Sequence, residues 1–308
     1  MGVFVFLPLV LPLTAWPIAR LAEQHLHPVT ATRLLAGVSA LMALSSTVCL
    51  ALIMVVGTAQ LPGNPLPDSW SDPEVRKAVP YDEVVGIIAI PALAVVAASC
   101  VWTVWRHHRV RRSAVRALAG IRPSPVAVLP DESPYAYALP GRRGRIVVST
   151  AMLACLDSGE RRALFAHERV HLTASHHRYL LAAQLAARAN PFLRPLCTAV
   201  AYGAERWADE EAARVIGNRR VMARAVGKAA LVSRGTPSPA LAGFAAGPVP
   251  RRVAALLGPM PPARSWPSAF TVAGVAVWTA AAGATASALS SANSAVALFL
   301  VLKAATPL

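Results

Sequence analysis

Charged residues are scarce in this chain, where Asp, Glu, Lys and Arg together make up 15% of 308 residues. In soluble globular proteins they make up about a quarter. Hydrophobic residues reach 55%, and many of them stand in long runs without a charge. The composition therefore argues against a wholly soluble protein, and it predicts that part of the chain lies in a lipid bilayer.

Cysteines are also few, and no two of them form a C-x-x-C pair. A zinc ribbon held by cysteines is therefore excluded, and we expect no framework of disulfides. Instead, we expect four small apolar side chains in the core or facing lipid, namely Cys49, Cys100, Cys155 and Cys197.

Acidic residues are half as common as basic ones, 15 against 30, and the formal net charge is +15. Such an excess is typical of nucleic-acid-binding proteins and of the cytoplasmic flanks of membrane helices. The sequence contains no helix-turn-helix pattern and no interleaving of basic and aromatic residues. Its densest basic run, at residues 106–112, directly follows an apolar stretch. We therefore expect a lipid bilayer, and no nucleic acid, as a partner.

Long apolar runs are the first positive signal, because about 20 such residues span a bilayer as a helix. No Lys or Arg precedes Arg20, which argues against a signal peptide and favours a retained membrane helix. Ser290 to Asn293 interrupt the last run, and residues 295–302 beyond them are too few to span alone. About four transmembrane helices are predicted, at residues 3–19, 34–56, 84–105 and 269–289.

The charges on the two sides of the third predicted helix differ in sign. The proline-rich stretch 57–83 is mostly acidic, whereas basic residues follow the helix. Lys and Arg concentrate on the cytoplasmic side of membrane helices. Residues 1–105 are therefore predicted to hold three helices with an external loop, residues 106–264 a cytosolic domain, and residues 265–308 the fourth helix and a short tail. Heavy use of Ala, Arg and Pro is typical of a high-GC bacterium, so we expect a multi-pass protein of a bacterial cell membrane.

The predicted cytosolic domain begins with strands and continues with helices, an α+β order. Three short strands are expected at residues 126–129, 135–139 and 145–150. Asp157 and Glu160 then form a capping box, and the helix that they start is expected to run to about Ala189, before Asn190-Pro191. Further helices are expected at about residues 196–216, 220–233 and 251–257.

The first of these helices carries the motif His167-Glu168-Arg169-Val170-His171, which reads H-E-x-x-H. Residues four apart share a helix face, so His167 and His171 can offer their imidazoles to one metal ion. Glu168 lies beside them and can act as general base on a metal-bound water. A pattern this short also arises by chance, but here it follows a strand and a helix cap, which is the context that the motif requires.

A catalytic zinc usually has three protein ligands, so a third ligand is expected downstream. His176 and His177 follow on the same predicted helix, but one is rotated away from the motif face and the other lies too far along the axis. We expect both to be exposed or interfacial. Glu205 and Asp209 share a face of the next helix, which antiparallel packing would bring against the motif. Glu205 can then complete a His-His-Glu site, and Asp209 can accept a hydrogen bond from a ligand imidazole.

Other charged side chains carry weaker signals. The helix that carries Glu205 and Asp209 could simply present an ordinary charged face to solvent. We expect its Glu210 and Glu211 to be solvated. No oxyanion-stabilising side chain stands out. Arg251, Arg252 and His177 are the basic residues that could serve.

The two motifs together resemble those of a known family. His167-Glu168-x-x-His171 followed by Glu205-x-x-x-Asp209 is similar to the gluzincin peptidases of the HtpX kind, and more closely to the BlaR/MecR-type membrane zinc metallopeptidases. The order of three helices, a protease domain and one helix also fits. The resemblance implies an α-helical membrane protein with a cytosolic α+β zincin-like peptidase domain. The resemblance also implies that His167, His171 and Glu205 hold Zn²⁺ and that Glu168 is the catalytic base. Asp209 would accept a hydrogen bond from a ligand imidazole.

The chain departs from this family in one respect. Members that sense β-lactams carry a penicillin-binding domain after the fourth helix, whereas residues 290–308 hold no S-x-x-K motif. We therefore expect no antibiotic sensing by that route. The resemblance implies a zinc-dependent endopeptidase that cuts a cytosolic or membrane-associated protein, such as a transcriptional repressor in a signalling pathway. The alternative is a catalytically silent signalling or scaffold protein that binds a regulator through the zincin domain.

Overall fold

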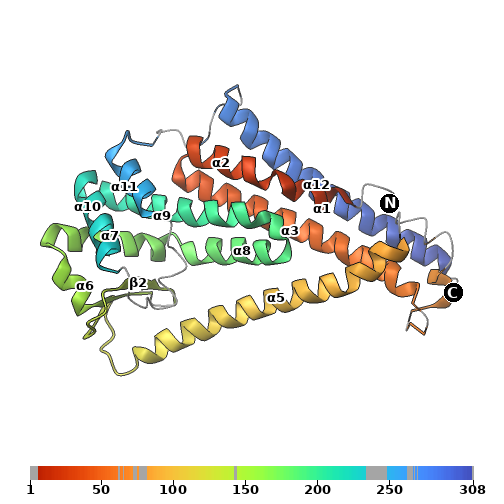
Figure 1. Cartoon of the computed structure of the whole chain (residues 1–308), viewed down its shortest axis with the longest axis horizontal. Coiled ribbons are helices and arrows are strands. Elements are labelled where there is room, and N and C mark those ends of the chain that lie inside the picture. The colour runs from red at the N-terminus through yellow and green to blue at the C-terminus, as the bar shows by residue number, and fades with distance from the viewer. Residues whose placement is uncertain are drawn as a thin grey trace.

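The fold is mostly helical, with one small sheet (Figure 1). A computed structural model describes residues 6–61, 63–64, 66–71, 75, 82–141, 144–233, 248–261, 266, 268 and 270–306. The α-helices are α1 (Leu7–Val10), α2 (Ala15–His25), α3 (Pro28–Ala59), α5 (Asp82–Ala117), α6 (Thr150–Cys155), α7 (Ser158–Thr173), α8 (His176–Ala189), α9 (Arg194–Ile216), α10 (Arg219–Val232), α11 (Val249–Leu257) and α12 (Val272–Ala305). Short 3-10 helices are η2 (Leu11–Thr14), η3 (Asp68–Ser71) and η4 (Pro191–Leu193).

Three of the described helices, α3, α5 and α12, are long and apolar enough to cross a membrane. They contain the predicted spans 34–56 and 84–105 and most of 269–289. The apolar part of α5 is only 11% buried within the protein, and the helix runs along one edge of the molecule (Figure 1). This exposed apolar surface is compatible with a membrane protein.

The N-terminal segment differs from the single helix expected over residues 3–19. Residues 3–5 lie outside the described part, and the rest forms α1, η2 and α2 in succession. Pro8 stands in the first turn of α1 and Pro12 in the first turn of η2, where α1 ends because proline lacks the N–H that would continue it. Helix α2 then continues beyond the predicted end at residue 19 to His25.

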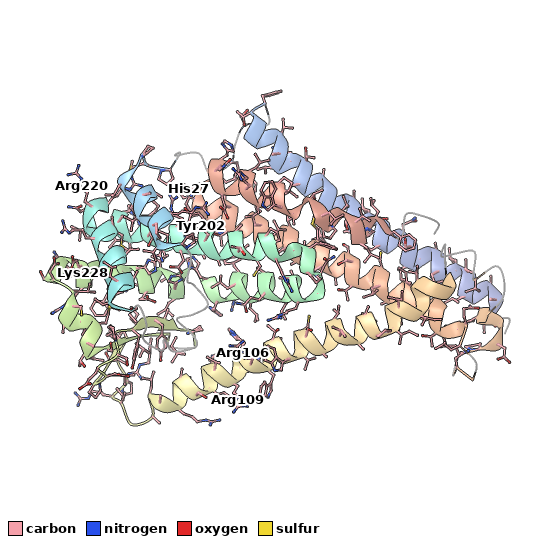
Figure 2. The ribbon with its side chains drawn as sticks, in the orientation of Figure 1. His27, Arg106, Arg109, Tyr202, Arg220 and Lys228 are labelled. Carbon is pink, nitrogen blue, oxygen red and sulfur yellow. The ribbon has the colours of Figure 1, made fainter. Side chains whose placement is uncertain are left out.

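Two membrane-length helices extend further than the sequence indicates. Helix α5 continues from its apolar part through the basic run to Ala117, and Arg106 and Arg109 lie on it (Figure 2). Helix α12 continues through Ser290–Asn293, so the expected interruption there is wrong and residues 295–302 belong to the same helix. Ser291 accommodates this because its hydroxyl donates to the Ala288 carbonyl at 2.9 Å instead of competing for the backbone.

The three expected strands are confirmed as β1 (Val126–Leu129), β2 (Ala136–Leu139) and β3 (Arg145–Ser149). Their order is β1-β3-β2, with β1 parallel and β2 antiparallel to β3, so β2 is an edge strand. Val147 and Val148 of the central strand are completely buried. In the register, Val148 pairs with Ala136, and β2 also packs against α7.

Helix α7 begins as expected, with a capping box. The Asp157 carboxylate accepts from the Glu160 N–H, and the Glu160 carboxylate accepts from the Asp157 N–H. Lys228 of α10 also donates to Glu160, at 2.9 Å, and ties the start of α7 to the helical layer (Figure 2). The expectation of one helix up to Ala189 is wrong, because Ser175 adopts a left-handed conformation with φ of 55° and separates α7 from α8.

The helices α3, α8 and α9 share one core, which includes Leu35, Ala183 and Leu196. Gly203 of α9 lies so close to α3 that an added Cβ would come within 2.7 Å of the Thr32 hydroxyl. The first part of a membrane-length helix therefore packs directly on the helix that carries the expected third ligand. All four cysteines are free, as expected.

Candidate metal centre

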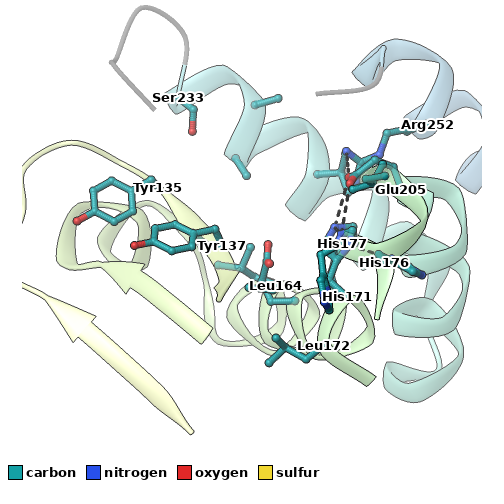
Figure 3. Close-up of a pocket in the computed structure, with 18 of the residues that line it drawn as sticks. Tyr135, Tyr137, Leu164, His171, Leu172, His176, His177, Glu205, Ser233 and Arg252 are labelled. Carbon is teal, nitrogen blue, oxygen red and sulfur yellow. Dashed lines mark hydrogen bonds and ion pairs between the residues drawn. The ribbon is translucent and has the colours of Figure 1, made fainter. Parts of the chain in front are cut away.

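Three side chains from two helices converge on one point. His167 and His171 lie four residues apart on one face of α7, and Glu205 reaches them from α9. Figure 3 labels His171 and Glu205. The two Nε2 atoms are 3.1 Å apart. The Glu205 carboxylate lies 3.5 Å from the Nε2 of His167 and 3.3 Å from that of His171. This group of three could hold a metal ion.

The spacing and chemistry of these donors fit zinc. Ligand atoms bound to a tetrahedral Zn²⁺ at 2.0–2.1 Å stand about 3.3 Å apart, close to the distances between these atoms. The Glu205 Oε1 atom is buried and accepts no hydrogen bond among the described residues, although it lies 3.3 Å from the His171 ring. A cation between these donors would satisfy an oxygen that is otherwise costly to bury.

Each imidazole has a partner on its outer side. The Nδ1 atom of His167 lies 3.1 Å from Asp209 Oδ1, the neighbour that the sequence predicts, although the two atoms do not meet in hydrogen-bonding geometry. The Nδ1 atom of His171 lies 2.8 Å from the Nδ1 atom of His176. The expectation that His176 is exposed or interfacial is wrong, since its side chain is 1% exposed. The left-handed Ser175 interrupts the helix between α7 and α8, so that His176, the first residue of α8, lies against His171, which an uninterrupted helix would not allow.

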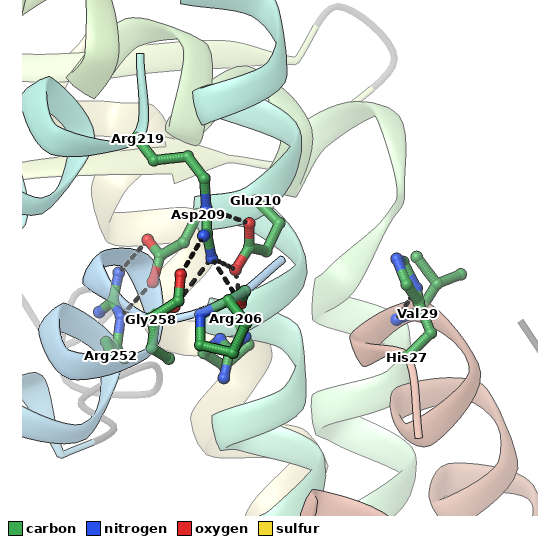
Figure 4. A network of polar contacts seen from close by, with 10 residues as sticks. His27, Val29, Arg206, Asp209, Glu210, Arg219, Arg252 and Gly258 are labelled. Carbon is green, nitrogen blue, oxygen red and sulfur yellow. Dashed lines mark hydrogen bonds and ion pairs between the residues drawn. The ribbon is translucent and has the colours of Figure 1, made fainter. Parts of the chain in front are cut away.

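Arg252 of α11 connects the two carboxylates. Its guanidinium donates to both oxygens of Asp209, at 2.8 and 2.7 Å, and lies 2.7 Å from Glu205 Oε2 (Figure 4). The residue is buried. Sequence reasoning treated Arg252 only as one of three basic candidates for an oxyanion stabiliser. The structure instead directs its charge at the acidic residues of the centre.

The same segment corrects a second expectation. Glu210 is not solvated, because its side chain is 13% exposed and pairs with Arg206 and Arg219 (Figure 4). Arg219 also donates to the carbonyls of Ala255 and Gly258, so this network fixes the end of α11 against α9 and α10. Only Glu211, which pairs with exposed Arg214, behaves as a surface acid.

The local charges favour the cation-binding forms of Glu205 and His171, but they favour the protonated form of His167. Burial opposes ionisation of Glu205, but Arg252 and the two imidazoles hold the pKa of its carboxyl at about 2. Burial lowers the pKa of His171 to about 4 and that of His176 to about 3. Burial acts the same way on His167, but Asp209 and Glu205 outweigh it and raise the pKa of that ring to about 10. Metal binding would therefore release a proton from His167.

Glu168 is buried beside the three donors and faces the same cavity as they do. Burial raises the pKa of its carboxyl to about 7, while His167 and a hydrogen bond from the Ala138 N–H partly oppose the increase. A carboxylate with a pKa near neutrality can both accept and release a proton at physiological pH.

The donors line a cavity of about 350 Å³ with mainly apolar walls (Figure 3). Tyr137 comes from β2 and Tyr135 directly precedes that strand, whereas Leu164 comes from α7 and Met222 from α10. On the other side, the cavity reaches His177 and Leu180 of α8 and His107 of α5. The cavity thus extends from the metal centre along edge strand β2 and towards a membrane-length helix.

A comparison with protein families bears on this centre. The model of peptidase family M48 matches residues 103–193. The match supports the M48 metallopeptidase family. It includes the sheet and both motif histidines, whereas Glu205, Asp209 and Arg252 lie beyond it. No curated protein and no solved structure matches the chain. The resemblance to the HtpX and BlaR/MecR subtypes remains a prediction.

Proposed function

We propose that this protein is a membrane-anchored zinc endopeptidase that hydrolyses peptide bonds in a cytosolic or membrane-associated protein. The observation that carries the proposal is the convergence of His167, His171 and Glu205 at one point of an apolar cavity, with Glu168 beside them. The family match supports metallopeptidase chemistry, and the three apolar helices support attachment to a membrane.

In this proposal, His167, His171 and Glu205 are the zinc ligands. A bound zinc ion would polarise the peptide carbonyl and make a bound water more acidic. Glu168 would take a proton from the attacking water and later deliver it to the leaving amine. Asp209 orients the His167 ring, and Arg252 keeps both carboxylates ionised although they are buried.

The proposed location follows from the charge on α5. Arg106 and Arg109 stack on Trp102 and Trp105, with their guanidinium carbons 5.5 and 5.1 Å from the ring centres. Aromatic and basic residues of this kind gather where a helix leaves the bilayer on its cytoplasmic side. We therefore propose a bacterial cell membrane protein whose catalytic domain faces the cytoplasm. A transcriptional repressor is one protein that such a site could reach.

Purified full-length protein in detergent tests this function. We expect one zinc ion per chain and cleavage of an unfolded protein such as casein, or of the chain itself. A chelator should stop cleavage, and added Zn²⁺ should restore it. The control is His171→Ala, which removes one ligand and should lose both zinc and cleavage. Stoichiometric zinc without any cleavage would instead favour a silent signalling or scaffold protein.

A further inference from the structure

His176 occupies an unusual place beside the proposed centre. It is the first residue of α8, and it follows Ser175, whose φ of 55° is in the left-handed region. A non-glycine residue is rarely found there, and such a conformation persists only where the surrounding structure requires it. Its effect is to place the His176 ring against that of His171, with ring centres 4.8 Å apart.

The hydrogen bond between the two rings has only one possible direction if His171 binds a cation through Nε2. That nitrogen then offers its lone pair, so the proton of the neutral ring must be on Nδ1. The Nδ1–H of His171 therefore donates across the 2.8 Å contact, and the Nδ1 of His176 accepts. His176 must in turn be neutral, with its own proton on Nε2.

The outer nitrogen of His176 has no hydrogen-bond partner among the described residues, and it is buried. Its ring lies against Trp207 of α9, with ring centres 4.6 Å apart. Arg33 of α3 lies over the indole of Trp207, 5.0 Å from its centre. Arg33, on the membrane-length helix α3, thus contacts Trp207. Trp207 in turn packs against His176, the ring that contacts His171.

We infer that His176 is a positioning residue, which accepts the Nδ1–H of His171 and so fixes the tautomer and the orientation in which His171 can bind zinc. The inference rests on the proposed zinc site. Ligand histidines usually donate to a carboxylate, a carbonyl or water, and loss of such a partner typically weakens metal binding about 10–100-fold. Here a second imidazole takes that place.

Two substitutions distinguish a role of His176 as hydrogen-bond acceptor from a role in packing alone. His176→Leu fills much of the space but accepts nothing. His176→Asn retains an oxygen in the position of Nδ1. Zinc affinity of the full-length protein in detergent is measured by competition with a chromogenic chelator. The matched control is His177→Ala, because this adjacent ring makes no hydrogen bond to His171 in the part of the chain that the structure describes.

We expect His176→Leu to raise the zinc dissociation constant about 10–100-fold. His176→Asn should recover most of the lost zinc affinity, and His177→Ala should leave the dissociation constant at its wild-type value. The Co²⁺-substituted protein supplies a second readout, since its visible spectrum should change in the Leu variant and return towards that of the wild type in the Asn variant. If His176→Leu does not fold, His176→Ala replaces it in the same comparison.

Equal affinity of all variants, or equal loss in the Leu and Asn variants, would overturn the inference. Either result is distinct from failure of the proposed function, which would appear as absence of zinc binding in the wild-type protein or as zinc binding that survives His171→Ala.

Discussion

The guanidinium of Arg252 holds both oxygens of the Asp209 carboxylate, at 2.8 and 2.7 Å, although 43 residues separate them in the chain. Asp209 in turn contacts the ring of His167. Through this pair, α11 fixes the orientation of a proposed ligand on α7. Because Arg252 also contacts Glu205, one cation balances two buried carboxylates.

Removal of this cation should destabilise the folded protein. Arg252→Ala leaves Asp209 and Glu205 buried without their main counter-charge, and loss of one partner of a buried ion pair costs about 3–5 kcal/mol. We expect the free energy of unfolding to decrease by this amount, as measured by denaturant titration in detergent. Arg251→Ala is the control. Its pair with Glu23 is half exposed on the Arg251 side, so about 0–1 kcal/mol is expected. Equal effects of the two variants would contradict this role of Arg252.

Asp209→Ala should weaken zinc binding by a different route, because the His167 ring loses the acceptor on its outer nitrogen. An increase of about 10–100-fold in the zinc dissociation constant is expected. Glu211→Gln on the same helix is the control and should retain the wild-type affinity, since this acid pairs with exposed Arg214 at the surface. Chelator competition measures both, and an unchanged affinity of the Asp209 variant would exclude its orienting role.

The contact between α3 and α5 depends on two glycines. A Cβ on Gly57 would overlap the backbone of Gly86, and the reverse is also true. Small residues at such points allow apolar helices to pack closely. Gly57→Ala should therefore lower stability by about 1–3 kcal/mol through overpacking. Gly37→Ala, in the same helix but with open space around it, should be neutral or stabilising. Thermal unfolding in detergent compares them, and equal melting temperatures would refute the close contact.

The pH dependence of cleavage should reflect Glu168. Burial raises the pKa of this carboxyl to about 7, and a general base acts only when it is deprotonated. Because a nearby zinc ion would lower that pKa, kcat/KM should fall as the pH decreases, with a midpoint at or below about 7. Zinc content, measured at each pH, separates this effect from loss of the metal. A kcat/KM that stays constant from about pH 7 to about pH 5 at full zinc content would contradict the assignment.

Much of the site is encoded locally and could be predicted. The capping box at Asp157 determines where α7 begins, and helical spacing then places His167 and His171 on one face. The Glu205-x-x-x-Asp209 spacing was sufficient to predict contacts with those rings once the two helices were taken to be antiparallel. Strand β3 was recognisable from its β-branched residues.

Other features depend on tertiary structure. The break at Ser175 involves neither glycine nor proline, so no local signal indicated that His176 would return to the site. Arg252 could not be assigned because its partners Asp209 and Glu205 are remote in sequence and lie on another helix. The continuity of α12 was missed for a different reason. Serines such as Ser291 were interpreted as a break, whereas in an apolar helix they donate to their own backbone.

The most direct measurement of the central claim compares zinc content and cleavage in the variant Glu168→Gln. The substituted amide would retain the size of the side chain but accept no proton, and the three proposed ligands remain. The account predicts wild-type zinc stoichiometry together with loss of nearly all cleavage of the same substrate. Cleavage at the wild-type rate by zinc-loaded Glu168→Gln would contradict it.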